Sequence, residues 1–124
     1  MIELRKALHP LLKAIHSRVY FQRAPDTAQF PYLTYRFEVT TDGEGFEFVT
    51  LDVDGWDLPN DGDTTRLENL MADVKRELDK AVLTTENLVV SIYLDRKLPL
   101  EDENPNIIRR KHIYQGRLFE RRES

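Results

Sequence analysis

The 124-residue chain contains no cysteine, which excludes disulfide bonds, thiolate zinc sites and cysteine nucleophiles. It also has no apolar run near the roughly 20 residues that a membrane-spanning helix needs. The first ten residues are interrupted by Glu3, Arg5 and Lys6, whereas a secretory signal peptide needs an unbroken apolar stretch. We therefore expect a protein without membrane association, whose fold depends on a hydrophobic core.

A second absence is local: residues 37–63 contain no basic residue, although they carry nine acidic ones. Residues 1–36 have a net charge of +4, residues 64–100 are neutral, and residues 101–124 have a net charge of +1. The whole chain is therefore acidic, at −4, which disfavours a general nucleic-acid-binding protein. Because charges of opposite sign are gathered in separate segments, we expect a molecule whose faces differ in charge.

Length and apolar content indicate one folded domain that spans residues 1–124. Forty per cent of the residues are hydrophobic, which is enough for a core. Apolar periodicity predicts helices over residues 2–17 and 64–81. We expect an α+β domain with a mostly antiparallel sheet, a long β-hairpin and two helices packed on it. The expected strands cover residues 18–23, 32–39, 46–53, 88–94 and 107–121.

Four local features carry specific expectations. Pro10 should kink the first helix or start it afresh, because a mid-helix proline loses a hydrogen bond and clashes with the preceding turn. In residues 46–53 the apolar alternation changes phase, which predicts a bulge or burial on both faces. Residues 55–63 (GWDLPNDGD) and 98–106 (LPLEDENPN) are rich in polar and turn-forming residues, and we expect loops there.

The aspartates of the acidic segment are candidate metal ligands, because carboxylate oxygens bind hard cations. An EF-hand loop counted from Asp57 fails at its third position, Pro59, and an expected strand precedes it where a helix is required. A two-metal nuclease would use Asp52 and Asp54, which share one strand face, but no spacing identifies a further catalytic group. The alternative is a solvated strand face that leads into an aspartate-rich loop and a helix cap. The five aspartates are Asp52, Asp54, Asp57, Asp61 and Asp63.

Other sequence signatures of catalysis are missing. The histidines His9, His16 and His112 have no metal-ligand spacing, and we expect them to pack or to face solvent. No serine lies in a GxSxG-like sequence, and no glycine-rich loop is followed by GK[ST]. We therefore expect no enzymatic activity, no catalytic residue, no metal and no cofactor.

A basic cluster lies near the end of the chain, with six basic residues and one acidic residue within 14 positions. On a regular strand Arg109, Lys111 and Arg117 point to one face and Arg110 to the other. One face can meet DNA phosphates, the acidic strand of the same chain or of a neighbour, or solvent, and the sequence leaves these alternatives open. The basic residues are Arg109, Arg110, Lys111, Arg117, Arg121 and Arg122.

The order of the expected elements resembles a known family. A helix is followed by RVYFQRAP (residues 18–25), FPYLTYRF (30–37), VTLDVDGWD (49–57) and the amphipathic segment RLENLMADVKRELDKA (66–81). This arrangement resembles the tail terminator proteins, also called tail completion or tail-to-head joining proteins, of long-tailed bacteriophages and prophages. The resemblance covers residues 1–120 and rests on element order, the proline–tyrosine entry to the second strand, and the strand–Trp–helix unit.

The resemblance implies an α+β subunit without enzymatic activity that assembles with copies of itself into a ring, typically a hexamer. Such a ring binds the tail tube protein and caps the finished tail tube. It presents a surface to the head connector proteins and lets DNA pass through its centre without sequence-specific binding. It also implies a location at the tail–head junction of the virion, and in the host cytoplasm during assembly.

A closed ring needs two unlike surfaces on each subunit, because one surface meets a different surface of the next copy. Complementary charge in the acidic and basic segments suits such contacts. Strands 46–54 and 107–121 would suit a ring if they lay at opposite edges of the subunit, and would neutralise each other if they were paired. The candidate residues for a subunit interface or a channel lining are Glu44, Glu47, Asp52, Asp54, Asp57, Arg109, Arg110, Lys111 and Arg117.

Two other functions are open from the sequence. One is a small metal-dependent nuclease that uses Asp52 and Asp54. The other is a cytoplasmic adaptor that binds another protein through an exposed strand of its sheet. The nuclease would cleave DNA in the presence of Mg²⁺, whereas the adaptor would neither catalyse a reaction nor assemble with itself.

Overall fold

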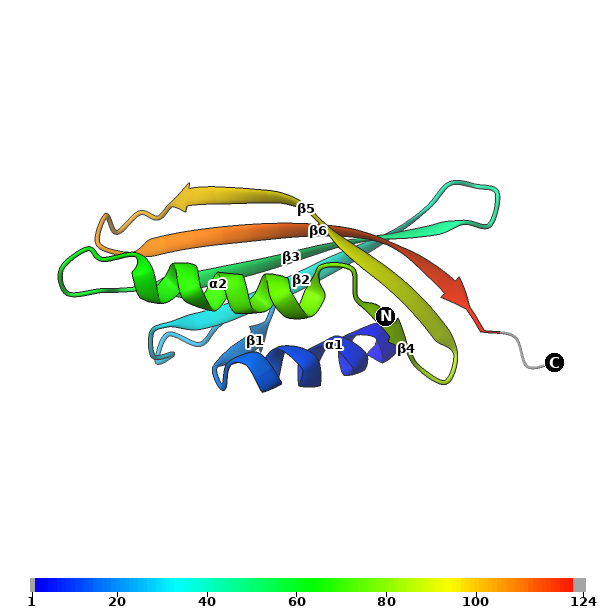
Figure 1. Ribbon diagram of the computed structural model, residues 1–124, viewed down its shortest axis with the longest axis horizontal. Helices are drawn as coiled ribbons and strands as arrows, with labels where there is room; N and C mark the ends of the chain where they lie inside the picture. Colours follow the sequence, from blue (N-terminus) through cyan, green and yellow to red (C-terminus); the bar gives the residue numbers. More distant parts are fainter. Residues whose placement is uncertain (1, 122–124) are drawn as a thin grey trace.

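The computed structural model describes residues 2–121, which form two helices on one side of a six-stranded sheet. The elements, in chain order, are α1 (Ile2–Ile15), β1 (Val19–Phe21), β2 (Tyr32–Thr41), β3 (Glu47–Asp57), α2 (Thr65–Leu78), β4 (Val82–Thr84), β5 (Leu88–Glu101) and β6 (Ile108–Glu120). Figure 1 shows long, curled strands, with α2 running along the direction of β3 and β6 and α1 beside it. Within residues 2–121, neither helix has the length and apolar character needed to cross a membrane.

The sheet has the strand order β1-β2-β3-β6-β5-β4. Each neighbouring pair is antiparallel except β1 and β2, which are parallel. β2 and β3 form a long hairpin, paired from Tyr32 opposite Trp56 to Thr41 opposite Glu47. The predicted α+β class, with a mostly antiparallel sheet, a long hairpin and two helices packed on it, is confirmed. β3 and β6 are the two central strands, so the acidic strand and the basic strand lie side by side.

The core lies between the helices and one face of the sheet. Alternate residues of each strand point toward the helices, because side chains in a strand alternate between its two faces. The apolar stripe predicted for α2 is buried from Leu67 to Leu78. The largest fully buried side chains come from both helices and from β2, β3 and β6: Tyr35, Tyr114, Leu4, Leu8, Leu12, Leu33, Leu51, Leu67 and Leu78.

α1 runs from Ile2 to Ile15 with Pro10 inside it, so the expected fresh start at Pro10 is wrong. Pro10 lacks the N–H group that would otherwise bond the carbonyl oxygen of Lys6, one turn earlier. Both residues are exposed, and water can therefore satisfy this carbonyl group. The amphipathic packing of the helix outweighs the lost hydrogen bond.

Two strands extend into segments where the sequence predicts loops. β3 includes residues 55–57 and β5 includes residues 98–101. Both pair with β6 at these positions, so the hydrogen-bond ladder outweighs the local turn preference. Proline has no N–H group to donate to a neighbouring strand, so it is tolerated in a strand only where no donor is needed. Pro99 meets this condition because β4 pairs only with residues 89–91 of β5, so that the rest of β5 is an edge on the side away from β6. The short strand β4 is not predicted by the sequence.

The phase change in residues 46–53 does not arise from a bulge. β3 pairs residue by residue with β6 along its whole length and with β2 from Glu47 to Trp56. Val49, Leu51 and Val53 point into the core, whereas Phe48 is half-buried on the opposite face. Of the two expected explanations, the bulge is therefore wrong, whereas burial on both faces agrees with the structure, because Asp54 is buried and Phe48, Asp52 and Trp56 are half-buried on the face away from the helices. A register shift lies in β5 instead, between Leu94 and Arg96.

Gly116 of β6 provides a test of this sheet, because a Cβ atom there would lie 2.2 Å from the backbone oxygen of Ser91. We expect Gly116→Ala to lower the free energy of unfolding by about 3 kcal/mol, since the two backbones would have to separate. Chemical denaturation followed by circular dichroism measures the change. The neighbouring variant Gln115→Ala is the control, and equal losses in the two variants would contradict the predicted close approach.

Candidate subunit interface

The acidic strand β3 and the basic strand β6 pair along the whole length of β3. Of the two arrangements considered from the sequence, the structure therefore has the paired one, and not the one with the strands at opposite edges. Their charged residues meet on the face of the sheet that points away from α1 and α2, which we call the helix-free face. It includes Tyr32, Thr34, Arg36, Phe48, Asp52, Asp54, Trp56, Arg109 and Lys111.

Three cations surround two aspartates on the helix-free face. Asp54 accepts hydrogen bonds from Nε of Arg109, at 3.1 Å, and from its Nη2 atom. Nζ of Lys111 lies 3.8 Å from Oδ1 of Asp54 and 3.6 Å from Oδ2 of Asp52, so it bridges the two carboxylates. Nε of Arg36 lies 3.4 Å from Oδ2 of Asp52. The prediction that Asp52 and Asp54 share one strand face is confirmed.

Asp54 is buried within this cluster, with 7% of its surface exposed. Its Oδ1 atom has no hydrogen-bond partner among residues 2–121, which leaves Lys111 as its counter-ion. The guanidinium of Arg109 lies over the ring of Trp56, 4.3 Å from its centroid, and the indole N–H donates to Thr34 at 3.2 Å. The stacking on Trp56 and the ion pair with Asp54 hold the Arg109 side chain in one position. This network of contacts therefore lies within a single chain and joins β2, β3 and β6.

These contacts bear on the nuclease alternative. A magnesium ion held by Asp52 and Asp54 would have to displace Arg109 and Lys111 from the same oxygen atoms. Among residues 2–121, no three His, Asp or Glu side chains are grouped so that they would hold a metal ion. The described cluster therefore does not resemble a two-metal centre, which needs several convergent carboxylates.

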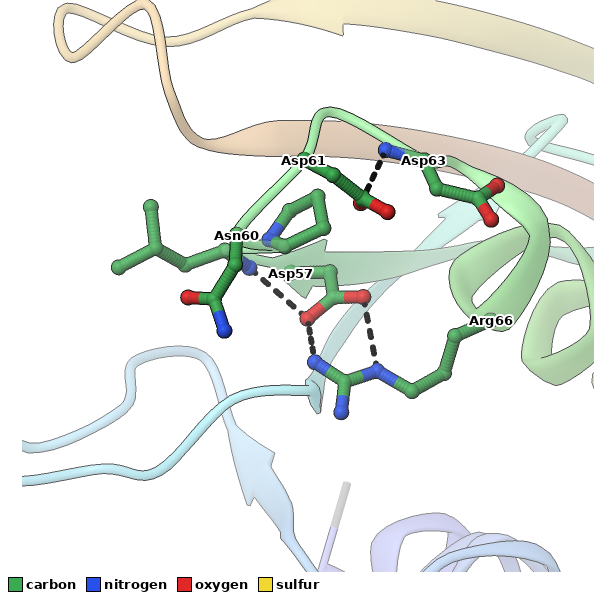
Figure 2. Close-up of a pocket in the computed structure, with 7 residues that line it drawn as sticks. Asp57, Asn60, Asp61, Asp63 and Arg66 are labelled. Atoms are coloured by element: carbon green, nitrogen blue, oxygen red, sulfur yellow. Dashed lines mark hydrogen bonds and ion pairs between the residues drawn. The ribbon is translucent and has the colours of Figure 1, made fainter.

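Asp57, at the end of β3, is fully buried and has its own cation (Figure 2). Its carboxylate accepts hydrogen bonds from Nε of Arg66, at 3.0 Å, and from the backbone N–H of Leu58, at 2.8 Å. The hydrogen bond to Asp57 raises the pKa of Arg66. This pair joins the end of β3 to the first turn of α2, so Asp57 has a structural role.

Asp61 and Asp63 shape the loop between β3 and α2. Asp61 accepts a hydrogen bond from the N–H of Asp63 at 3.0 Å. Asp63 accepts bonds from the N–H of Thr65, at 2.9 Å, and from its hydroxyl group, at 2.6 Å, and these bonds lower the pKa of Asp63. The aspartate-rich loop weighed against calcium binding is therefore confirmed, with Asp63 bonded to the first residue of α2, although the N-cap residue Thr64 makes no side-chain hydrogen bond. The solvated strand face expected before this loop is wrong, because Asp54 and Asp57 are buried.

The basic residues of β6 divide between the two faces as the strand alternation predicts. Arg110 points toward α2 and pairs with Glu68 at 2.7 Å. Beyond β6, Arg121 donates to the carbonyl oxygen of Thr85 at 2.7 Å. Arg122, which the sequence places in the same cluster, lies outside the described residues. Arg110 and Arg121 thus contact other segments of their own chain.

The remaining candidates lie together at the turn of the β2–β3 hairpin. Glu44 is in the turn, Glu47 is the first residue of β3, and Arg117 lies opposite Phe48 on β6. The Arg117 guanidinium is 6.0 Å from the centroid of the Phe48 ring. This group is separate from the Asp52 and Asp54 cluster. Its proposed role in a subunit interface or channel lining stays a prediction.

The three histidines pack within the fold. His9 is hydrogen bonded to the hydroxyl of Tyr35 at 2.8 Å, and His16 to the carbonyl oxygen of Pro31 at 2.8 Å. His112 is buried, 5% exposed, and is hydrogen bonded to the hydroxyl of Tyr114 at 3.1 Å. The contacts of His9 and His16 tie α1 and the residue after it to β2 and to the segment before β2, whereas the contact of His112 lies within β6. All three histidines thus pack within the fold, which is one of the two alternatives expected from the sequence.

Comparison with known proteins gives a likeness of fold. No protein-family profile matches the chain, and no curated protein matches it. A chain in the solved structure entitled "Virion of native gene transfer agent (GTA) particle" matches with a TM-score of 0.77 and 17% sequence identity. The match covers 96% of this chain and 96% of that chain. At this identity the likeness establishes that the two chains share their fold.

The ion cluster on the helix-free face is tested by Asp54→Ala, which leaves Arg109 and Lys111 without their shared carboxylate. We expect the free energy of unfolding to fall by about 2–3 kcal/mol, because both cations are largely buried. Asp73→Ala is the matched control, since it removes an exposed pair with Arg76 and should cost about 0.5 kcal/mol or less. Denaturation curves that place the two variants at the same stability would rule out a stabilising cluster.

His112 makes stability depend on pH, because burial lowers its pKa from 6.5 to about 4, with a smaller effect from the charge of Lys97. Between these values the unfolded chain binds the proton and the folded chain does not. Stability is therefore complete above about pH 6.5 and decreases by about 2–3 kcal/mol as the pH falls toward 4.

Chemical denaturation across this pH range, on the natural chain and on His112→Gln, measures the contribution of His112. The variant should lose the part of the slope that lies between the two pKa values. The same pH dependence in both chains would show that His112 is not held neutral by its environment.

Proposed function

We propose that the chain is a non-enzymatic virion assembly protein of the tail terminator type. Identical subunits close into a ring, a hexamer in the arrangement that the resemblance implies, on the end of the tail tube. The ring joins the tube to the head connector proteins at the tail–head junction, and DNA passes through its centre without sequence-specific contacts. Before assembly the subunits are present in the host cytoplasm.

The observation that carries this proposal is the likeness to a chain of a gene transfer agent virion over 96% of both chains. A likeness of this extent involves the whole fold and not one common motif. The resemblance in sequence to tail terminators, which rests on element order and the strand–Trp–helix unit, points to the same kind of particle. The two observations together favour a virion role over an adaptor.

The pairing of β3 with β6 removes the charge complementarity that these strands would offer to a ring contact, and its bearing on the proposal is on catalysis. The strongest catalytic candidates, Asp52 and Asp54, are held by Arg36, Arg109 and Lys111 within the subunit. A rigid sheet stabilised in this way suits a subunit that presents surfaces to copies of itself, since ring contacts depend on fixed relative geometry. The acidic and basic segments outside this cluster supply the unlike surfaces.

Assembly is tested with the purified chain by size-exclusion chromatography with light scattering, over a wide range of protein and salt concentrations. We expect a discrete oligomer that weakens as salt screens its ion pairs. Electron microscopy of tail tubes incubated with the chain should show rings at one end of each tube. A chain that stays monomeric and leaves the tube ends bare would contradict the proposal.

A further inference from the structure

An apolar patch lies at the turn end of the β2–β3 hairpin. Phe46 is 53% exposed, and Phe119, in the neighbouring strand β6, is 47% exposed. With Phe48 they line a surface hollow of about 280 Å³. We call these three residues, with the adjacent Glu44 and Glu47, the hairpin patch. Exposed aromatic side chains gathered in this way are typical anchors of protein–protein contacts.

The turn that carries the hairpin patch is held in one shape by Asp42. Its carboxylate accepts hydrogen bonds from the backbone N–H groups of Glu44, at 2.8 Å, and of Phe46, at 3.2 Å. The N–H of Asp42 in turn donates to the carbonyl oxygen of Phe46 at 3.2 Å. The exposed ring is therefore presented by an ordered turn, which reduces the entropy lost on binding.

The border of the hairpin patch is mostly acidic. Glu47 and Glu120 line the hollow, and Glu44 is exposed in the turn. Within residues 2–121, neither Glu44 nor Glu47 belongs to an ion pair. Arg117 also lines the hollow, with its guanidinium over Phe48. A partner for this patch should therefore offer an apolar side chain flanked by cations.

The outward side of α1 has this composition. Ile2 is 65% exposed, and Arg5 and Lys6 follow it one helical turn later. Lys13 lies two turns further and donates to the carbonyl oxygen of Ser17 at 2.7 Å. In the described part of the chain, none of these three cations belongs to an ion pair with a carboxylate.

We propose that the hairpin patch of one copy docks on the outward side of α1 of a second copy. Phe46 then packs against Ile2, and Glu44 and Glu47 face the lysines of α1. Leu58, another exposed apolar side chain, is a poorer partner because it follows Asp57 in the aspartate-rich loop and carries charge of the same sign around it. The inference rests on the proposed ring, and it assigns the two surfaces that form the ring contact.

The two surfaces lie apart in one subunit. α1 packs on α2 and β1, whereas the hairpin turn projects beyond the helices at one end of the sheet (Figure 1). Since the contact joins two different surfaces, each copy keeps one patch and one α1 face free for the next copy. Such a heterologous contact repeats around a closed ring.

Charge reversal provides the test. The first variant combines Glu44→Lys with Glu47→Lys, and the second combines Lys6→Glu with Lys13→Glu. Each variant alone brings like charges together at every contact, and we expect its self-association to weaken by roughly tenfold or more. In an equal mixture, each hairpin meets an α1 face of opposite charge, so association should return with the two chains in alternation.

The mixture is measured by sedimentation velocity, with circular dichroism to show that each variant is folded. A third variant, Glu101→Lys with Glu103→Lys, makes the same change in net charge as the first variant, at the end of β5 and in the loop after it, and should associate like the natural chain. A fourth, Phe46→Ser, removes the apolar anchor and should weaken association without a change in the melting temperature.

The outcomes separate this inference from the proposed function. Loss of association in each reversed variant and recovery in the mixture supports the inference. Association of both reversed variants at the natural strength overturns it, while the ring itself stands. Loss without recovery in the mixture also overturns it. A natural chain that stays monomeric overturns the inference, and the capping of tail tubes then decides the proposed function separately.

Discussion

The pairing of β3 with β6 is the contact on which the rest of the structure depends. It places the most acidic strand of the chain beside the most basic one at the centre of the sheet. Asp54 is almost fully buried there, and an unpaired carboxylate in such a position would be strongly destabilising. Arg109 and Lys111, from β6, supply the compensating charges. The order of the strands and the charge pattern of the sequence therefore explain each other.

This pairing also determines what the molecule offers to partners. The charge segregation of the sequence is largely cancelled at the centre of the sheet, so the surfaces that still differ in charge lie at its periphery. The hairpin turn keeps its acidic residues, and α1 keeps its basic ones. The aspartates that look most like catalytic groups in the sequence are part of the scaffold. The molecule is thus a sheet held together by internal ion pairs at its centre, with unpaired charges at its periphery.

Much of the fold is predictable because it depends on local periodicity. The stripe of α2 and the alternation in β2 and β6 indicate these elements and the faces that they bury. The order of the strands depends on contacts between distant segments, so no local pattern shows that β3 and β6 are neighbours. Gly55 illustrates the difference: it reads as a turn residue, but it lies in β3, where a Cβ atom would be 2.5 Å from Sδ of Met71. The ion pair of Arg66 with Asp57 likewise has no signal in the sequence, because it depends on how α2 sits on the sheet.

A double-mutant cycle between Asp54→Ala and Arg109→Ala tests most directly that the acidic and basic strands neutralise each other within one subunit. The account predicts a favourable coupling of roughly 1–3 kcal/mol in the free energy of unfolding, unchanged when the protein concentration is varied. A coupling near zero, or one that appears only at concentrations where the chain associates, would show that these charges meet between copies, and would contradict the account.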